Sequence, residues 1–335
     1  MKKYLYLLLT VSLLSCASGK KTTLNDENIA TKYATEINAS DLKEHLYVLA
    51  SDILEGRKTG EKGQKMAANY ITAYYKHLGL KAPKGHDDYL QKIPKEFFNG
   101  ASKDNSENIV AYIKGSEKPD EFVVISAHYD HLGMKGKEVY NGADDNGSGT
   151  TAVLEIAQAF QKAKKGGHGP KRSILFINLT GEEEGLYGSK YYTSHPIFSL
   201  KNTIVDLNID MVGRVDKKHE GKPDYIYLIG ADKLSTDLHK LSEEVNKKYT
   251  QLKLDYKYND DKDPNRFYYR SDHYNFAKNN IPIIFYFNGV HEDYHKTTDT
   301  PDKINFDLLA KRAQLVFYTA WEIANRENRL VVDKK

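Results

Sequence analysis

The chain has 335 residues, with 49 basic and 46 acidic side chains and a formal net charge of +3. This near balance, with basic residues scattered along the chain and no nucleic-acid-binding motif, argues against a nucleic acid or another polyanion as partner. The chain has one cysteine, which excludes a disulfide within it.

The first residues, MKKYLYLLLTVSLLSC, have the features of a secretory signal peptide. Lys2 and Lys3 form a positive start, and the apolar stretch after them is too short to span a bilayer as a helix. The ending LLSC resembles the lipobox of bacterial lipoproteins, in which the chain is cut before the cysteine and the thiol is acylated. We expect a signal peptide over residues 1–15 and a membrane anchor at Cys16. The protein would then be a cell-envelope lipoprotein, periplasmic or tethered to the outer membrane; the alternative is an ordinary secretory signal with an incidental cysteine.

The next segment predicts a tether and two helices. Residues 17–38 lack apolar periodicity, so 16–38 is interpreted as the lipidated cysteine followed by a flexible tether. Ser40 is a candidate N-cap for a helix over DLKEHLYVLAS. A second helix is expected over residues 63–80. Its apolar residues at helical spacing are Ala67, Ile71, Tyr74 and Leu78.

Six short apolar runs follow, each of strand length and rich in β-branched or aromatic residues. In chain order they are ENIVAYIKG, EFVVISAHYDH, RSILFINLTGEEE, TIVDLNIDMVG, DYIYLIG and IPIIFYFNG. Helical patterns lie between and after them, at 148–164, at 234–245 and at 306–326. Strands that alternate with helices predict an α/β fold, namely a single three-layer α/β/α domain over residues 39–330 with a mixed, largely parallel sheet.

Metal-ligating side chains follow several of these runs. They are His128 with Asp130, the glutamates 182–184, Asp210, and Tyr294 with His295; the stretch NGADDNGSG leads into the 148–164 helix. Each of these alone predicts only a turn or a hydrogen-bonded structural residue. Strand ends meet at one edge of a parallel sheet, however, and so much negative charge buried there requires cations. Histidines and carboxylates without cysteine suit Zn²⁺ better than Ca²⁺ or Mg²⁺.

Five motifs occur in the order and spacing of metallopeptidase family twenty-eight, which contains two-zinc leucyl aminopeptidases and glutamate carboxypeptidases. They are HYDHLG, NGADDNGSG, TGEEEGLYGS, NIDMVG and YHKTTDT. The chain resembles the family over nearly all of its mature length, and LASDILEGRKTGEKG resembles the N-terminal segment of bacterial members. The family's protease-associated insert is missing here. The resemblance implies the zinc-exopeptidase, phosphorylase/hydrolase-like fold.

The resemblance also implies a ligand set for two Zn²⁺ ions. His128 and Asp210 would hold one ion, and Glu183 and His295 the other. The bridging carboxylate of the family pattern falls on Asp145, the second aspartate of GADDNGSG.

Catalytic roles follow in the same way. In the family pattern the first glutamate of the run is the general base, so Glu182 would take a proton from the attacking water. Glu184 would be a spectator that faces solvent. Asp130 resembles the acid that accepts the second N–H of the histidine ligand, and Tyr294 matches a tyrosine that some members use to hold the oxyanion.

These implications predict a zinc-dependent aminopeptidase that removes N-terminal residues from peptides. No basic pocket for a substrate carboxylate stands out, which favours an aminopeptidase over a carboxypeptidase, although Arg214 and Arg270 could each line the site. A glutaminyl-cyclase-like enzyme with one zinc ion and a metal-free binding module of the same fold are the alternatives. Two, one or no equivalents of zinc would separate the three.

The predicted anchor can be tested with Cys16→Ser. Because the acylated thiol is the expected attachment point, the variant should lose its lipid and leave the membrane fraction while catalysis by the folded domain stays unchanged. Incorporation of radiolabelled fatty acid measures the effect. Equal incorporation by wild type and variant would show that the lipobox interpretation is wrong.

Overall fold

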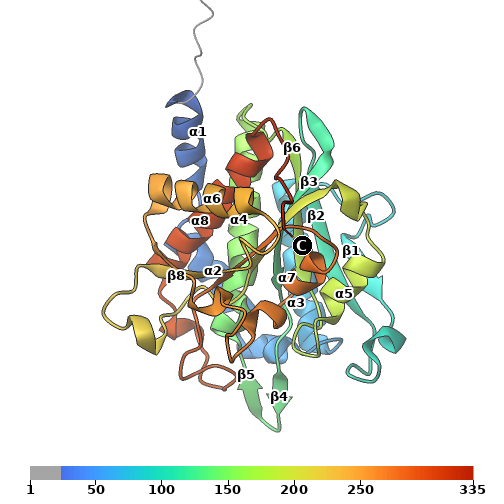
Figure 1. Ribbon diagram of the computed structural model, residues 1–335. Coiled ribbons are helices and arrows are strands. Elements are labelled where there is room, and N and C mark those ends of the chain that lie inside the picture. Colours follow the sequence, from blue (N-terminus) through green and yellow to red (C-terminus); the bar gives the residue numbers. More distant parts are fainter. Residues whose placement is uncertain (1–23, 335) are drawn as a thin grey trace, which may run out of the picture.

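The structure is a computed structural model that describes residues 24–334 (Figure 1). Its centre is an eight-stranded sheet with the order β1-β2-β6-β3-β7-β10-β8-β9. The strands are β1 (Leu90–Ile93), β2 (Ser106–Ile113), β3 (Lys118–His128), β6 (Arg172–Leu179), β7 (Thr203–Ile209), β8 (Tyr225–Ile229), β9 (Lys253–Asp255) and β10 (Ile283–Phe287). The four central strands, β6, β3, β7 and β10, are parallel, whereas β1, β2 and β8 make antiparallel pairs. The predicted mixed α/β sheet is therefore confirmed.

The six apolar runs of the sequence are β2, β3, β6, β7, β8 and β10. Every residue of β6 is buried, which explains why it reads as a continuous apolar run rather than an alternating one. The strands that the sequence pattern missed are short. β1 and β9 lie at the two edges of the sheet, and a separate hairpin joins β4 (Gly133–Lys135) to β5 (Glu138–Tyr140). Three or four residues are too few to show a period of two.

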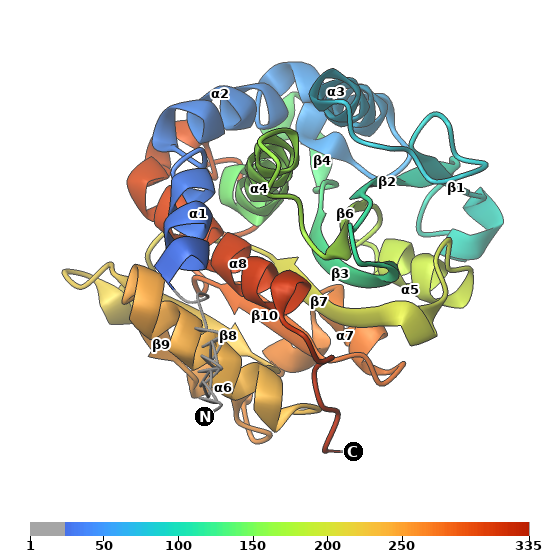
Figure 2. The same cartoon turned by 90° about the horizontal axis from the view of Figure 1, so that it is seen from above.

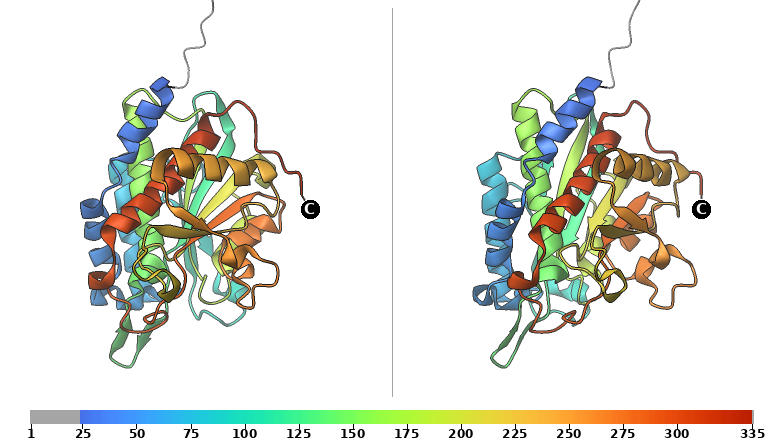
Figure 3. Two further views of the ribbon diagram at one scale, coloured as in Figure 1. Left: turned by 60° about the vertical axis from the view of Figure 1, so that its left-hand side comes forward. Right: turned by 90° about the vertical axis from the view of Figure 1, so that its left-hand side faces the viewer.

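Helices cover both faces of the sheet (Figures 2 and 3). One face packs in a large apolar cluster with α1 (Leu24–Ala34), α2 (Ala39–Leu49), α3 (Lys62–Leu78), α4 (Gly149–Lys165), α6 (Thr236–Val245) and α8 (Phe306–Asn325). The other face packs against α5 (Tyr187–Ser194) and α7 (His273–Ala277). The helices expected at 63–80, 148–164, 234–245 and 306–326 correspond to α3, α4, α6 and α8. None of the described helices is long and apolar enough to cross a membrane.

The structure corrects the prediction of a flexible tether over residues 16–38. Residues 24–34 form α1, and the folded part of the chain thus begins well before residue 39. Ala30, Tyr33, Ala34 and Ile37 are all buried, and Tyr33 stacks on the ring of Trp321 in α8. These four positions follow the helical pattern i, i+3, i+4, i+7, but their apolar stripe is too narrow to be recognised in a polar segment. Cys16 and the predicted signal peptide lie outside the described residues.

The start of α2 also differs from the prediction. The N-cap is Asn38, whose side-chain oxygen accepts a hydrogen bond from the Asp41 N–H at 3.0 Å. Ser40, the expected cap, lies inside the helix. Both residue types are good caps, so the sequence alone did not distinguish them.

Candidate metal centre

The carboxyl ends of the four central strands bring the expected ligands to one edge of the sheet. His128 is the last residue of β3, Asp210 follows β7 directly, and Glu183 follows β6 after a short turn. His295 lies in the loop after β10, and Asp145 lies in the turn before α4. Two groups of side chains that could hold a metal ion form there, one with His128 and one with Glu183, and Asp145 belongs to both.

The first group is arranged around the imidazole of His128. Its Nε2 lies 3.4 Å from Asp210 Oδ1 and 3.5 Å from Asp145 Oδ1. Glu182 Oε2 is farther away, at 3.9 Å. The side chain of His128 is buried, and its Nε2 has no hydrogen-bond partner within residues 24–334.

The second group consists of Glu183, Asp145 and His131. The predicted ligand His295 lies beside these residues. Its Nε2 lies 3.0 Å from Asp145 Oδ2 and 3.3 Å from Glu183 Oε2. The two oxygens of Asp145 therefore face different histidines, as a bridging carboxylate requires. His295 has a positive φ of 57°, a backbone conformation that is rare outside glycine and frequent at functional sites.

The donor set fits zinc. Atoms bound to one tetrahedral Zn²⁺ lie roughly 3.3–3.6 Å apart, close to the separations within both groups. Burial raises the pKa of Asp145, and the neighbouring charge of Glu183 raises it further. Burial would lower the pKa of His128, but Asp210 and Glu182 raise it well above its ordinary value. Cations at these positions would relieve the repulsion among the carboxylates.

The turn that carries Asp145 is held by buried polar groups. Asp299 accepts hydrogen bonds from the N–H groups of Asp144 and Asp145, at 3.0 and 3.1 Å. Asp144 does not face a metal group: its Oδ2 lies 3.1 Å from His291 Nε2, and its Oδ1 accepts the Gly213 N–H at 2.7 Å. The two adjacent aspartates thus have different surroundings.

A buried arginine, Arg57, connects the N-terminal segment to the turn after His128 and to the turn before Asp145. The guanidinium of Arg57 donates to the carbonyls of Tyr129 (2.8 Å), Asn141 (2.7 Å), Gly142 (2.9 Å) and Leu49 (2.5 Å). Arg57 is only 1% exposed. Burial lowers its pKa to about 10, so it remains a cation at neutral pH beside the acidic site.

The glutamate run occupies a tight turn between β6 and α5. The carbonyl oxygen of Glu182 accepts hydrogen bonds from the N–H groups of Gly185 and Leu186. Gly188 lies so close to the end of β6 that a Cβ there would be 2.2 Å from the Thr180 carbonyl oxygen. Burial opposes ionisation of Glu183, but hydrogen bonds from His131 and His295 hold its pKa well below the usual range. Glu184, the predicted spectator facing solvent, belongs to neither metal group and is partly buried.

Asp130 and Tyr294 both lie beside the metal groups. The carboxylate of Asp130 accepts hydrogen bonds from Thr59 Oγ1 (2.8 Å) and the Glu182 N–H (3.2 Å). His128 Nδ1 lies 3.2 Å from the Asp130 carbonyl oxygen and 3.7 Å from its carboxylate, so the main-chain oxygen is the closer acceptor. The ring of Tyr294 stacks on His295 with centroids 3.8 Å apart.

A small cavity of about 30 Å³ opens at the metal groups. Its lining residues are Asp145, Glu182, Asp210, Met211, Phe267, Arg270, Phe285, Phe287, Tyr294 and His295. The lining thus combines acidic and aromatic side chains with one arginine, Arg270. Arg214, the other arginine that the sequence suggested, is instead paired with Asp293 at 3.0 Å and Glu292 at 3.2 Å.

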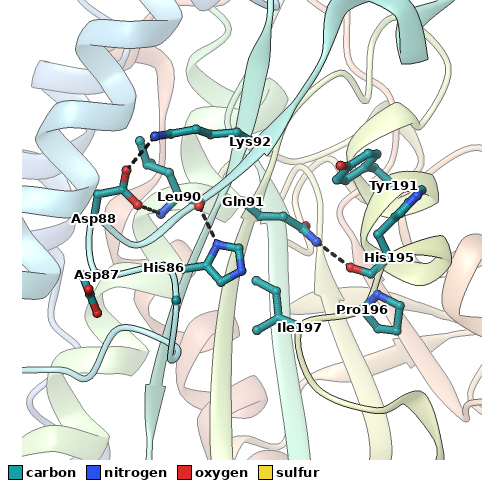
Figure 4. A pocket seen from close by; sticks show the side chains of 11 residues that line it. His86, Asp87, Asp88, Leu90, Gln91, Lys92, Tyr191, His195, Pro196 and Ile197 are labelled. Atoms are coloured by element: carbon teal, nitrogen blue, oxygen red, sulfur yellow. Dashed lines mark hydrogen bonds and ion pairs between the residues drawn. The ribbon is translucent and has the colours of Figure 1, made fainter.

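A much larger cavity, of about 660 Å³, lies between β1 and α5 and shares no lining residue with the metal cavity (Figure 4). Its polar groups bind one another: Gln91 donates to the His195 carbonyl oxygen at 2.8 Å, and His86 Nδ1 lies 2.8 Å from the Leu90 carbonyl oxygen. Size alone would therefore identify the wrong site, because the groups that could hold a metal lie elsewhere.

Sequence reasoning missed three residues that support the site. His131 contacts Glu183, and Asp299 accepts a hydrogen bond from the N–H of Asp145. Arg57 binds the turn after His128 and the turn before Asp145. The second histidine of HYDHLG and the arginine of LEGRKTG were visible signals without an assigned role. Asp299 is the aspartate of YHKTTDT, but nothing in that motif showed that it binds the peptide of Asp145, more than 150 residues away.

Comparison with known proteins identifies the family of the chain. The model of peptidase family M28 matches residues 108–320. Aminopeptidase YwaD of Bacillus subtilis is 26% identical over 277 residues, which are 77% of this chain and 53% of that protein. A probable zinc metalloprotease of Pyrenophora tritici-repentis is 37% identical over 116 residues, but the match covers 32% of this chain and only 22% of that protein. The chain thus spans about half or less of the length of these two relatives.

Solved structures share the fold. The LapA aminopeptidase of Legionella pneumophila superposes with a TM-score of 0.72 at 20% identity, covering 98% of this chain and 81% of that one. The zinc aminopeptidase BSAP of Bacillus subtilis gives a TM-score of 0.67 at 19% identity, covering 87% and 96%. At these identities the likeness concerns the fold alone. The family match covers well over half of the chain and includes all five expected ligands, so the protein belongs to peptidase family M28.

Proposed function

We propose that the protein is a zinc aminopeptidase that uses two metal ions to hydrolyse the N-terminal bond of peptides. The observation that carries this proposal is the Asp145 carboxylate, whose two oxygens face His128 and His295 at 3.5 and 3.0 Å. A one-metal, cyclase-like site would not need this bridge. The aminopeptidase among the relatives supports the reaction class.

The residues that would hold zinc are His128 and Asp210 for one ion, Glu183 and His295 for the other, and Asp145 for both. The chemistry that bound zinc supplies is a water acidic enough to attack at neutral pH and a polarised scissile carbonyl.

Glu182 is our candidate for the general base. It lines the small cavity beside the ligands without belonging to either metal group. From there its carboxylate would accept a proton from the attacking water and pass it to the leaving amine. The Tyr294 hydroxyl, in the same cavity, would donate a hydrogen bond to the developing oxyanion.

We further propose that the protein acts in the cell envelope as a lipid-anchored enzyme. The support for this is the LLSC sequence that closes the apolar stretch at the N-terminus.

A screen of aminoacyl chromogenic amides with purified protein tests the proposed reaction. Hydrolysis should be abolished by a chelator and restored by added Zn²⁺, and the active protein should contain two equivalents of zinc. One equivalent with cyclisation of N-terminal glutamine would favour the cyclase alternative, and no bound metal would favour a binding module.

The two adjacent aspartates should respond differently to the same change. Asp145→Asn should lose zinc and nearly all activity, because a neutral amide is a poor bridge between two cations. Asp144→Asn should keep zinc but unfold at lower temperature, since loss of one partner of a buried ion pair costs about 3–5 kcal/mol. Metal analysis and thermal unfolding measure both effects. If Asp144→Asn is the variant that empties the site, the bridge has been assigned to the wrong aspartate.

The three glutamates of the run should show three different behaviours. Glu182→Gln keeps the shape of the side chain but cannot accept a proton. Zinc should stay bound while kcat falls by about 10²–10⁴ with little change in KM. Glu183→Gln removes a charged ligand, so one zinc ion should be lost or held weakly, and the melting temperature should drop because bound metal stabilises the folded state.

Glu184→Gln is the matched control for this series. Since Glu184 belongs to neither metal group, its replacement should change the free energy of unfolding by less than about 0.5 kcal/mol and leave turnover intact. Steady-state kinetics and metal analysis on all three variants decide the assignment. An inactive Glu184→Gln beside an active Glu182→Gln would contradict it.

A further inference from the structure

We propose that His131 is a positioning residue that orients the Glu183 carboxylate toward the second metal site. It is the second histidine of HYDHLG, three residues after His128. It stands with Asp145 and Glu183 in one of the two groups that could hold a metal ion, although the ligand set implied by the family resemblance does not include it. The inference rests on the proposed two-metal function, because it concerns one ligand of that site.

The contact between the two side chains is short and enclosed. His131 Nδ1 lies 2.7 Å from Glu183 Oε1, whereas His295 Nε2 lies 3.3 Å from Glu183 Oε2. The two histidines therefore approach different oxygens of one carboxylate. The side chain of His131 is fully buried and that of Glu183 nearly so, which strengthens an electrostatic contact between them.

The distances favour a hydrogen bond over metal ligation by His131. A separation of 2.7 Å is typical of an N–H donor and a charged carboxylate, and it is shorter than the roughly 3.3–3.6 Å between two ligands of one tetrahedral Zn²⁺. The same Nδ1 is 3.9 Å from Asp145 Oδ2, so it does not approach the bridge. His295 Nε2, by contrast, lies 3.0 Å from Asp145 Oδ2 and 3.3 Å from Glu183 Oε2 and so approaches two carboxylates at once, as a ligand of a metal ion shared with them would.

The tautomer of His131 follows from the surroundings of its two ring nitrogens. Glu183 can only accept, so we assign the proton to Nδ1. Nε2 is buried without a partner within residues 24–334, and a second proton there would be an unsatisfied donor. The neutral Nδ1–H form satisfies both conditions and leaves the negative charge of Glu183 available to a metal ion.

The imidazole is held in place by the segment that also contains Arg57. The His131 N–H donates to the Arg57 carbonyl oxygen at 3.2 Å. The ring lies against Gly142, where a Cβ would be 2.5 Å from Cγ and Cδ2 of the histidine. With the ring confined on this side, its Nδ1–H is aimed at Glu183 before any metal binds.

Two substitutions separate orientation from ligation. His131→Leu removes the donor and should weaken the binding of one zinc ion by about 10- to 100-fold, the usual cost of losing such a partner of a metal ligand. His131→Asn places an amide N–H near the position of Nδ1 and should restore affinity close to that of wild type. Competition with a chromophoric chelator measures both affinities on purified protein.

His219→Leu is the matched control. His219 is also buried, and its Nδ1 lies 2.7 Å from a carboxylate oxygen of Asp216, outside the metal groups. This variant should lower the melting temperature of the metal-free protein without changing zinc affinity. A loss of zinc affinity of the same size in His219→Leu would mean that general destabilisation explains the result for His131, and would overturn the proposal.

The visible absorption spectrum of Co²⁺-loaded protein gives a readout that does not depend on turnover. Wild type and His131→Asn should have the same spectrum, because the atoms bound to the metal do not change. A spectrum altered in His131→Asn would make His131 a ligand and overturn the positioning role, as would unchanged zinc affinity in His131→Leu. If wild type itself binds fewer than two ions, the proposed function fails instead, and the two failures are thus distinguishable.

Discussion

The buried negative charge at one edge of the sheet is the constraint on which the site depends. Asp130, Asp145 and Asp210 are almost fully buried there, and the side chains of Glu182 and Glu183 beside them are mostly buried. Carboxylates in such a place are costly unless they are paired, hydrogen-bonded or bound to cations. Several features of the surrounding structure reduce this cost.

The protein's own cations and hydrogen-bond donors compensate part of the buried negative charge. Arg57 keeps a positive charge inside the domain and uses its guanidinium on four main-chain carbonyls, two of them in the turn before Asp145. Asp144, which no metal group includes, is compensated by His291. The negative charge of Asp145 and of the candidate ligands beside it remains, and this is where metal ions fit.

The fold explains why the charge gathers at this edge. Parallel strands all end on the same side, and here β3, β6, β7 and β10 end in or lead directly to a metal-binding or catalytic candidate. The faces of the sheet are occupied by apolar clusters, so the strand ends are the place where polar side chains can converge. The larger cavity beside β1 has no such convergence, which is why its size does not make it the functional site.

The sequence by itself determined the succession of the main strands and helices along the chain, and through its family resemblance it implied the ligand set. The strands are a local property, because a buried strand is a continuous apolar run, and the candidate ligands His128 and Asp210 stand at the ends of two such runs. Only the tertiary structure decided that residues 24–34 are a packed helix, that each oxygen of Asp145 faces a different histidine, and that His131 and Arg57 support the ligand turns. These features depend on contacts between residues far apart in the chain, almost 290 positions for Tyr33 and Trp321, and no local pattern shows which residues will meet. The polar partners that orient the site therefore became visible only once the chain was folded.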